Sequence, residues 1–298
     1  MLALIGTIPY DGFPILSGEI SVKNSNILIG EKSFQIKRGF KAMIGAASIV
    51  CKELSLFPPT AFTAGDIGLG DGSKRLYEHL RNQLSGIQVS VLTFHYLMPD
   101  IFWHDQIIKA IEEMSKKPIL IADAGFMYVA KMSGFAPFYD LFTPDIGELA
   151  FLADELAPHP FYTRGFICHE ENNVPSLISR AYKSENASKF LIVKGENDYI
   201  CSNGEIIAII KEPNVETLEP IGGTGDTLTG IVSALVYSGY AIEDAAVMAA
   251  IINRLAGELA NPSPSTQVSE IISYIPKALS IVLKSLDKKN NEIHVKGN

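Results

Sequence analysis

Short apolar runs alternate with amphipathic stretches through most of this 298-residue sequence, and this alternation constrains the fold more than any other feature. The apolar runs predict strands at residues 60–65, 88–94, 118–123, 139–144 and 189–195. The amphipathic stretches predict helices at residues 40–54, 73–84, 104–114, 146–156 and 175–184. Strand and helix in repeated succession predict an α/β fold with a mostly parallel central sheet and helices on both faces.

The two ends of the chain depart from this repeating pattern. Residues 198–202 and 205–210 flank the turn pair Asn203-Gly204, which predicts an antiparallel hairpin at an edge of the sheet. We expect another edge hairpin within residues 1–38. Helices are predicted from Asp226, at 242–260 and at 266–286, and the second is apolar almost all round, which indicates burial. We expect a single domain over 1–298 with a frayed tail from 288.

The composition restricts the classes of partner. Hydrophobic residues make up 47% of the chain and charged residues 19%, which is enough apolar material for a large core. A net charge of −8 without a Lys/Arg block argues against nucleic acid or an anionic membrane as partner. The start of the chain lacks a signal-peptide pattern and no apolar run has membrane-spanning length. We therefore expect a soluble, cytoplasmic protein, and the sequence leaves open whether it forms a homo-oligomer.

The cysteines and histidines give little sign of a metal site. Three cysteines lie far apart without a C-x-x-C pair, so neither a disulfide framework nor a zinc site is indicated. His95 and His104 have no helical partner at ligand spacing, and we interpret both as structural. Residues 157–175 are Pro-rich and irregular, so we expect a long loop there rather than a metal site at 168–171.

Residues 221–230, IGGTGDTLTG, carry the most specific chemical signal. Glycines and a threonine lead into Asp226 at the start of a helix, where unpaired N–H groups and the positive dipole end can hold an anion. A carboxylate beside such an anion hole suits a base that takes a hydroxyl proton as the hydroxyl attacks a phosphoryl group. The alternative is a glycine-rich loop in which Asp226 is an ordinary helix cap.

Further polar loops follow the predicted strands at residues 65–70, 123–125, 143–148 and 194–195. Ligands bind beyond the carboxyl ends of parallel strands, so these loops could converge on one crevice. The glycine spacing does not match a dinucleotide-binding loop, and no G-K-[ST] follows the glycines of a Walker A loop. Lys194 either faces this crevice and a phosphate or ends its strand in solvent. Asp145 and Glu148 either cap a helix or lie near Mg²⁺, and both roles can hold together.

The motifs and their order resemble those of the ribokinase-like superfamily. Within it they are most similar to the NAD(P)H-hydrate dehydratase family, and the chain looks like a divergent member of that family. The resemblance covers residues 40 to 280, approximately, and the GGTGD segment is its most specific part. The matching segments, in the family's order, are DIGLG (66–70), DAG (123–125), TPDIGE (143–148), VKG (193–195), GGTGDTLTG (222–230) and INRLAGELA (252–260).

The resemblance implies an enzyme that uses ADP or ATP with Mg²⁺ to phosphorylate the hydroxyl of hydrated NADH or NADPH and then eliminates phosphate. It also implies a role for particular residues at each part of the site. These are Asp226 as the base; Gly223, Thr224 and Gly225 at the phosphate; Lys194, Gly195 and Asn253 at the nucleotide; Gly68, Gly70, Asp123 and Asp145 on the acceptor side; and Glu148 toward Mg²⁺ through water.

The chain departs from the family pattern on the acceptor side. Asp145 and Ile146 replace a His-Pro pair, Gly125 replaces the second Asp of D-A-D, and the N-terminal glycine-rich region is reduced to GFKAMIGAA at 39–47. These departures leave open a kinase for a small alcohol, such as a sugar, a hydroxymethylpyrimidine or a thiazole alcohol. A non-catalytic nucleotide-binding regulator is a further alternative, but such a protein would have no need of Asp226.

Overall fold

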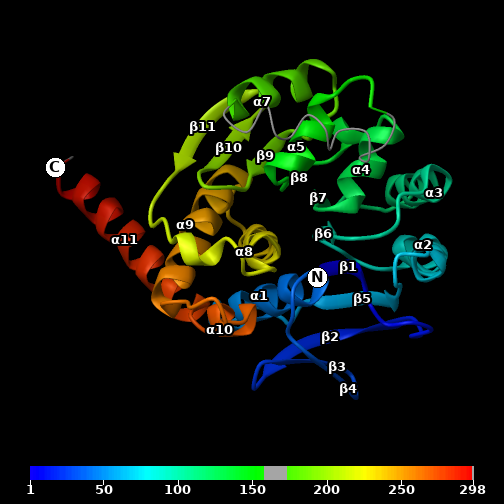
Figure 1. Cartoon of the computed structure of the whole chain (residues 1–298), viewed down its shortest axis with the longest axis horizontal. Helices are drawn as coiled ribbons and strands as arrows, with labels where there is room; N and C mark the ends of the chain where they lie inside the picture. Colours follow the sequence, from blue (N-terminus) through cyan, green and yellow to red (C-terminus); the bar gives the residue numbers. More distant parts are fainter. Residues whose placement is uncertain (158–172, 297–298) are drawn as a thin grey trace.

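The computed structural model describes residues 1–157 and 173–296, with side chains up to residue 286. Its strands are β1 (Leu2–Ile8), β2 (Leu16–Lys23), β3 (Asn26–Ile29), β4 (Lys32–Gln35), β5 (Thr60–Gly65), β6 (Val91–Phe94), β7 (Ile119–Ala122), β8 (Leu141–Phe142), β9 (Phe190–Val193), β10 (Asp198–Ser202) and β11 (Glu205–Ile210). They form one sheet in the order β11-β10-β9-β8-β7-β6-β1-β5-β2-β3-β4 (Figure 1). The run from β9 to β5 is parallel, and antiparallel strands extend the sheet at both ends.

Two groups of helices cover the two faces of this sheet (Figure 1). On one face lie α1 (Phe40–Glu53), α8 (Thr224–Tyr237), α9 (Ile242–Ala260), α10 (Val268–Ile272) and α11 (Ile275–Lys296). On the other lie α2 (Asp71–Gln83), α3 (Ile101–Glu112), α4 (Gly125–Met132), α5 (Ile146–Ala153) and α7 (Val174–Lys183). Strand β1 shows why both faces are needed, because Leu2 and Leu4 belong to one apolar core and Ala3 and Ile5 to the other.

The predicted fold class is confirmed: the sheet is mostly parallel, has helices on both faces and carries the β10–β11 hairpin at an edge. The edge hairpin expected within residues 1–38 exists only as β2, β3 and β4, whereas β1 lies between β5 and β6 at the centre of the sheet. All seven residues of β1 are buried, as a central strand requires.

The C-terminal region also differs from expectation. The helix predicted at 266–286 is two helices, α10 and α11, and α11 continues to Lys296. The frayed tail from 288 stays a prediction. All strands in the described part of the chain belong to one sheet, and the single domain stays a prediction. Among the residues that the structure describes, no helix combines the length and apolarity needed to cross a membrane.

Candidate active site

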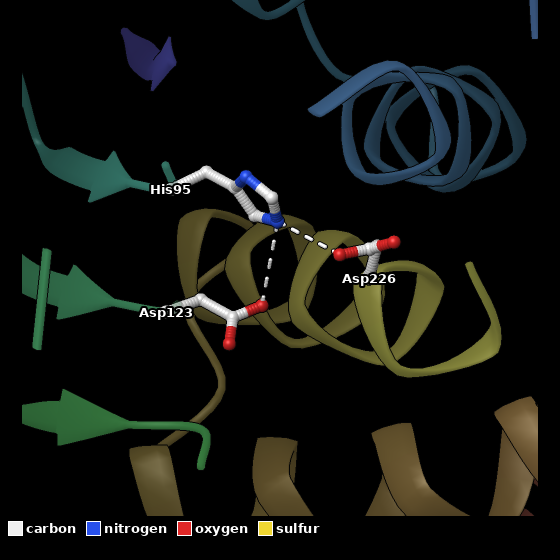
Figure 2. Close-up of side chains that lie close together, drawn as sticks. All are labelled: His95, Asp123 and Asp226. Atoms are coloured by element: carbon white, nitrogen blue, oxygen red, sulfur yellow. Dashed lines mark hydrogen bonds and ion pairs between the residues drawn. The ribbon is translucent and has the colours of Figure 1, made fainter. Parts of the chain in front are cut away.

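Polar side chains gather where three parallel strands end. His95 follows β6, Asp123 follows β7 and Lys194 follows β9, while Asp226 approaches them from the first turn of α8. Figure 2 shows the side chains of His95, Asp123 and Asp226 pointing toward one another. This edge of a parallel sheet is where α/β proteins bind their ligands. Of the loops expected to converge, those at 123–125, 194–195 and 221–230 meet here.

Asp226 is held by two hydrogen-bond donors from distant parts of the chain. One carboxylate oxygen, Oδ1, lies 2.8 Å from His95 Nε2, and the other accepts a hydrogen bond of 2.6 Å from the backbone N–H of Gly39. Asp226 makes no capping bond to its own helix, whose N-cap is Gly223 without a side-chain cap, so it is not an ordinary helix cap. Burial alone would raise the pKa of Asp226, but the His95 bond and the Lys194 charge lower it to about 2. The carboxylate is therefore ionised at neutral pH.

Lys194 faces the same crevice instead of ending its strand in solvent. Its ammonium lies 2.8 Å from Asp123 Oδ1, and the two side chains are 13% and 2% exposed. The other Asp123 oxygen accepts a hydrogen bond of 2.7 Å from the Thr229 hydroxyl on α8. Burial lowers the pKa of Lys194, but the charges of Asp123 and Glu148 raise it by more than burial lowers it. The pKa therefore lies above its usual value, and the ammonium stays charged. A β-carbon added to Gly225 would lie 3.6 Å from Lys194 Nζ, so the charge sits beside the start of α8.

The start of α8 has the features expected of an anion hole. Gly223 has a φ of +110°, which strains any residue other than glycine, and a β-carbon there would also be in tight contact, 3.1 Å from both Arg38 and Val268. Helix α1 also begins at a glycine without a side-chain cap, Gly39, whose N–H faces Asp226. Two helix N-termini therefore direct positive potential at the space around Asp226.

The carboxylates of Asp123 and Asp226 have basic side chains, His95 and Lys194, as neighbours. His95 Nε2 lies 3.8 Å from Asp123 Oδ2, and the ligand atoms of His95, Asp123 and Asp226 all lie within 4.8 Å of one another. Burial lowers the pKa of His95, but the bond to Asp226 and the charge of Asp123 raise it above its usual value. Because His95 and the Lys194 ammonium already face both carboxylates, the cluster suits proton transfer better than cation binding.

Asp145 and Glu148 form a reciprocal cap at the start of α5. The Glu148 N–H donates to Asp145 Oδ1 at 2.7 Å, and the Asp145 N–H donates to Glu148 Oε2 at 2.9 Å. Burial, with the charges of Asp145 and Asp123, raises the pKa of Glu148 to about 8 although Lys194 opposes the shift. The capping interpretation is thus correct, and the role toward Mg²⁺ stays a prediction.

The residues predicted at the nucleotide are tied to the loops around α8. The Asn253 carbonyl oxygen accepts a hydrogen bond of 2.6 Å from Thr227, and its amide donates to the Thr224 carbonyl at 3.1 Å. This side chain braces the first turn of α8, a role that the sequence did not suggest. A contact of Asn253 with adenine stays a prediction.

The Gly195 carbonyl is held by Arg254, a residue that the sequence did not single out. The Arg254 guanidinium donates to Asp198 at 2.7 Å and to the carbonyl oxygens of Gly195 and Glu196 at 3.0 and 2.8 Å. Arg254 is buried and follows Asn253 directly on α9. It therefore fixes the loop between β9 and β10 that carries the predicted nucleotide contact.

On the predicted acceptor side, Gly68 and Gly70 shape the turn between β5 and α2. Their N–H groups donate to Asp66 Oδ1 at 2.9 and 3.1 Å, and both have positive φ angles. Gly125, where the family pattern has Asp, begins α4, and a β-carbon there would lie 3.1 Å from the Tyr96 ring. Tyr96 is 38% exposed, so a partly accessible aromatic side chain lies beside Gly125.

The interpretation of His95 as structural did not anticipate that this side chain contacts Asp226. The position was recognisable, since His95 follows its strand in the same way as Asp123 and Lys194 follow theirs. For His104 the structure agrees with the interpretation: it is fully buried, 2.8 Å from the Tyr139 hydroxyl, away from these side chains. Most of the loop expected at 157–175 lies outside the described residues.

Several proteins of known sequence are similar to this chain. A family model described as NAD(P)H-hydrate dehydratase matches residues 99–277, which include Asp123, Lys194 and Asp226 but not Gly68, Gly70 or His95. An uncharacterised protein of Methanocaldococcus jannaschii is 46% identical over 246 residues, 81% of this chain and 100% of that protein. Shorter matches are a bifunctional NAD(P)H-hydrate repair enzyme of Hyperthermus butylicus, 33% identical over 40% of this chain and 22% of that protein, and a hydroxyethylthiazole kinase of Pediococcus pentosaceus, 31% identical over 41% and 43%.

Solved structures share the fold at low sequence identity. A ribokinase-like superfamily protein of Enterococcus faecalis has a TM-score of 0.57 and 16% identity, over 94% of this chain and 86% of that one. An ADP/ATP-dependent NAD(P)H-hydrate dehydratase of Bacillus subtilis, co-crystallised with ATP and Mg²⁺, has a TM-score of 0.54 and 14% identity, over 81% and 84%. The fold is therefore ribokinase-like.

Proposed function

Because this chain belongs to the NAD(P)H-hydrate dehydratase family, we propose that it repairs hydrated NADH or NADPH at the expense of ADP or ATP, with Mg²⁺. The observation that carries the proposal is Asp226, an ionised and largely buried carboxylate at an uncapped helix N-terminus beside the Lys194 ammonium. An anion-binding helix start with an adjacent base is what phosphoryl transfer to a hydroxyl requires.

In the proposed reaction the nucleotide's terminal phosphate lies over the start of α8. The backbone N–H groups of Thr224, Gly225 and Asp226 donate to it, an effect of about 3 kcal/mol per well-placed donor. The Lys194 ammonium faces the same phosphate. Mg²⁺ would neutralise phosphate charge when bound. In this proposal Glu148 would hold it through water after losing its proton, since Mg²⁺ needs only a carboxylate or two from the protein.

Asp226 removes the proton of the acceptor hydroxyl while the hydroxyl oxygen forms its bond to phosphorus and the bond to the nucleotide breaks. In the dehydratase, the ring nitrogen of the hydrated nicotinamide then donates its electron pair, the carbon–oxygen bond breaks and inorganic phosphate leaves. The neighbouring ring carbon loses a proton to water, and the ring double bond forms. The products are the reduced nicotinamide cofactor, the shortened nucleotide and phosphate. The donor and acceptor are the only partners that this reaction requires.

A kinase for a small aromatic alcohol is the second candidate. Two observations favour it: the thiazole kinase among the relatives, and the exchange of the acceptor-side Asp for Gly125 beside the exposed Tyr96 ring. In that reaction the transferred phosphate stays on the acceptor. Both candidates use Asp226 and Lys194 in the same way. We place either enzyme in the reducing cytoplasm, in keeping with the buried free thiols of Cys51 and Cys201.

The test is incubation with hydrated NADH, Mg²⁺ and either ADP or ATP. A dehydratase restores the absorbance of reduced nicotinamide and releases phosphate in equal amounts, and neither signal develops without nucleotide. A stable phosphorylated product, formed from hydrated NADH or from a panel of hydroxymethylpyrimidine, thiazole and sugar alcohols, would replace the dehydratase by the kinase. No nucleotide consumption with any acceptor would contradict both.

A further inference from the structure

We propose that His95 is a positioning residue for the base, orienting the Asp226 carboxylate through a proton that the imidazole Nε2 directs at Asp226 Oδ1. The inference rests on the proposed role of Asp226 as the base. No motif of the family resemblance includes His95, and the match to the family model begins after it, at residue 99. The resemblance therefore assigns His95 no role, and its role is inferred from the geometry alone.

The His95 ring is fixed before any ligand arrives. Its backbone N–H donates to the Ile5 carbonyl at 2.8 Å, and the residue is 4% exposed. One side of the ring packs near Phe40, with ring centroids 6.3 Å apart. Phe40 can lie there because Gly6 has no side chain; a β-carbon at Gly6 would be 2.4 Å from the Phe40 ring. Packing therefore determines where His95 Nε2 points.

The unpartnered nitrogen of His95 determines where its proton lies. Nδ1 is buried and makes no hydrogen bond to any residue that the structure describes, whereas Nε2 faces Asp226. A proton on Nδ1 alone would be buried without an acceptor, so the neutral ring keeps its proton on Nε2. His95 thus donates to Asp226 in both its neutral and its protonated forms.

This donor opposes the effect of burial on the base. Burial raises the pKa of Asp226, and the His95 bond and charge are the first of the effects that lower it, ahead of Lys194 and the Gly39 N–H. The other titratable groups that face the pair are Asp123 at the end of β7 and Lys194 at the end of β9. Without His95 the pKa of Asp226 would be higher, so the carboxylate would lose part of its ionised population as the pH falls. During transfer that proton moves to the carboxylate, and His95 keeps its own Nε2 proton.

The kinetic test compares His95→Leu with His95→Gln in the hydrated NADH reaction with ATP and Mg²⁺. The Leu variant has no donor, so its kcat should fall about tenfold for each pH unit below an apparent pKa that is higher than in the wild type. The Gln variant keeps a neutral N–H donor and should retain most of the wild-type kcat at pH 7. Equal losses in both variants, with unchanged pH profiles, would overturn the inference.

A matched control tests whether the packing of β6 against α8 is responsible. Thr93 lies two residues before His95, is fully buried and bonds to Ser233 of α8 at 2.9 Å, so Thr93→Val disturbs the same interface without touching Asp226. This variant should keep the wild-type pH profile. If kcat of Thr93→Val fell at low pH as much as kcat of His95→Leu, the effect would come from packing, and the inference would be contradicted.

A second measurement does not depend on any reaction and so separates this inference from the proposed function. NMR titration of the imidazole, assigned by its loss in His95→Gln, should give a His95 pKa above the usual value in the wild type and a lower one in Asp226→Asn. Identical values in the two proteins would show that the pair is not coupled, whichever substrate the enzyme uses. Coupling without turnover would support the pair and contradict the proposed function.

Discussion

Substitution of the base, Asp226→Asn, is the sharpest test of the site because the structure limits what the new amide can do. The carboxylate accepts one N–H bond from Gly39 and one from His95, at 2.6 and 2.8 Å. An amide has a single acceptor oxygen, so one of these donors must face its NH₂ group. The amide also cannot take a proton at neutral pH. A positioned base contributes about 10²–10⁴-fold to the rate, so the variant should lose about 3 to 5 kcal/mol of transition-state stabilisation.

Nucleotide binding should survive this substitution, since the Lys194 ammonium and the N–H groups of the helix start remain and a negative charge near the phosphates is removed. The assay is kcat in the hydrated NADH reaction together with the rise in Tm that ATP and Mg²⁺ produce. Asp140→Asn is the matched control, because Asp140 pairs with Lys189 at 2.7 Å away from the cluster around Asp226. Turnover above about a tenth of the wild type would rule out a base of ordinary strength. Loss of nucleotide binding together with turnover would also refute the assignment.

Three further substitutions test the surroundings of the base. Lys194→Ala should reduce the rise in Tm produced by ATP, and it should lower the free energy of unfolding by about 3 kcal/mol because Asp123 loses its buried partner; an unchanged ATP shift would place the phosphate elsewhere. Arg254→Leu should cost a similar amount in urea unfolding, and adding Asp198→Asn should recover part of it, since the buried carboxylate is then removed. Between about pH 4.5 and 8 the folded wild type holds a proton on Glu148 that the unfolded chain has lost, so the free energy of unfolding falls as the pH rises through this window. Glu148→Gln should make this fall smaller. Parallel stability curves for Glu148→Gln and wild type would contradict that effect.

Most of the architecture could be predicted from the sequence because apolar periodicity is a local property. The alternation of runs located the strands from β5 to β9 and the helices between them, and the Asn203-Gly204 pair located the hairpin of β10 and β11. The central place of strand β1 was missed because it depends on pairing with β5 and β6. These strands are distant in sequence: Ala3 pairs with Thr60, 57 residues later, and Leu2 pairs with Val91. Helix α4, between β7 and β8, was not predicted.

The site was predictable where it depends on strand ends and not where it depends on long-range pairs. Asp123 and Lys194 follow strands and Asp226 begins a helix, so the general rule for parallel sheets brought them together. His95 satisfied the same rule, but its partner lies 131 residues away, and nothing in its local sequence marks that bond. The brace formed by Asn253 likewise joins α9 to α8 through side chains, a contact that no periodicity reveals.

The most direct measurement of the central claim is a crystal structure of the protein with a non-hydrolysable ATP analogue and Mg²⁺. The terminal phosphate should accept hydrogen bonds of about 3 Å from the N–H groups of Gly225 and Asp226, with the Lys194 ammonium beside it and the Asp226 carboxylate facing an open acceptor site. A nucleotide bound with its terminal phosphate away from the start of α8, leaving Asp226 in contact only with His95 and Gly39, would contradict the account.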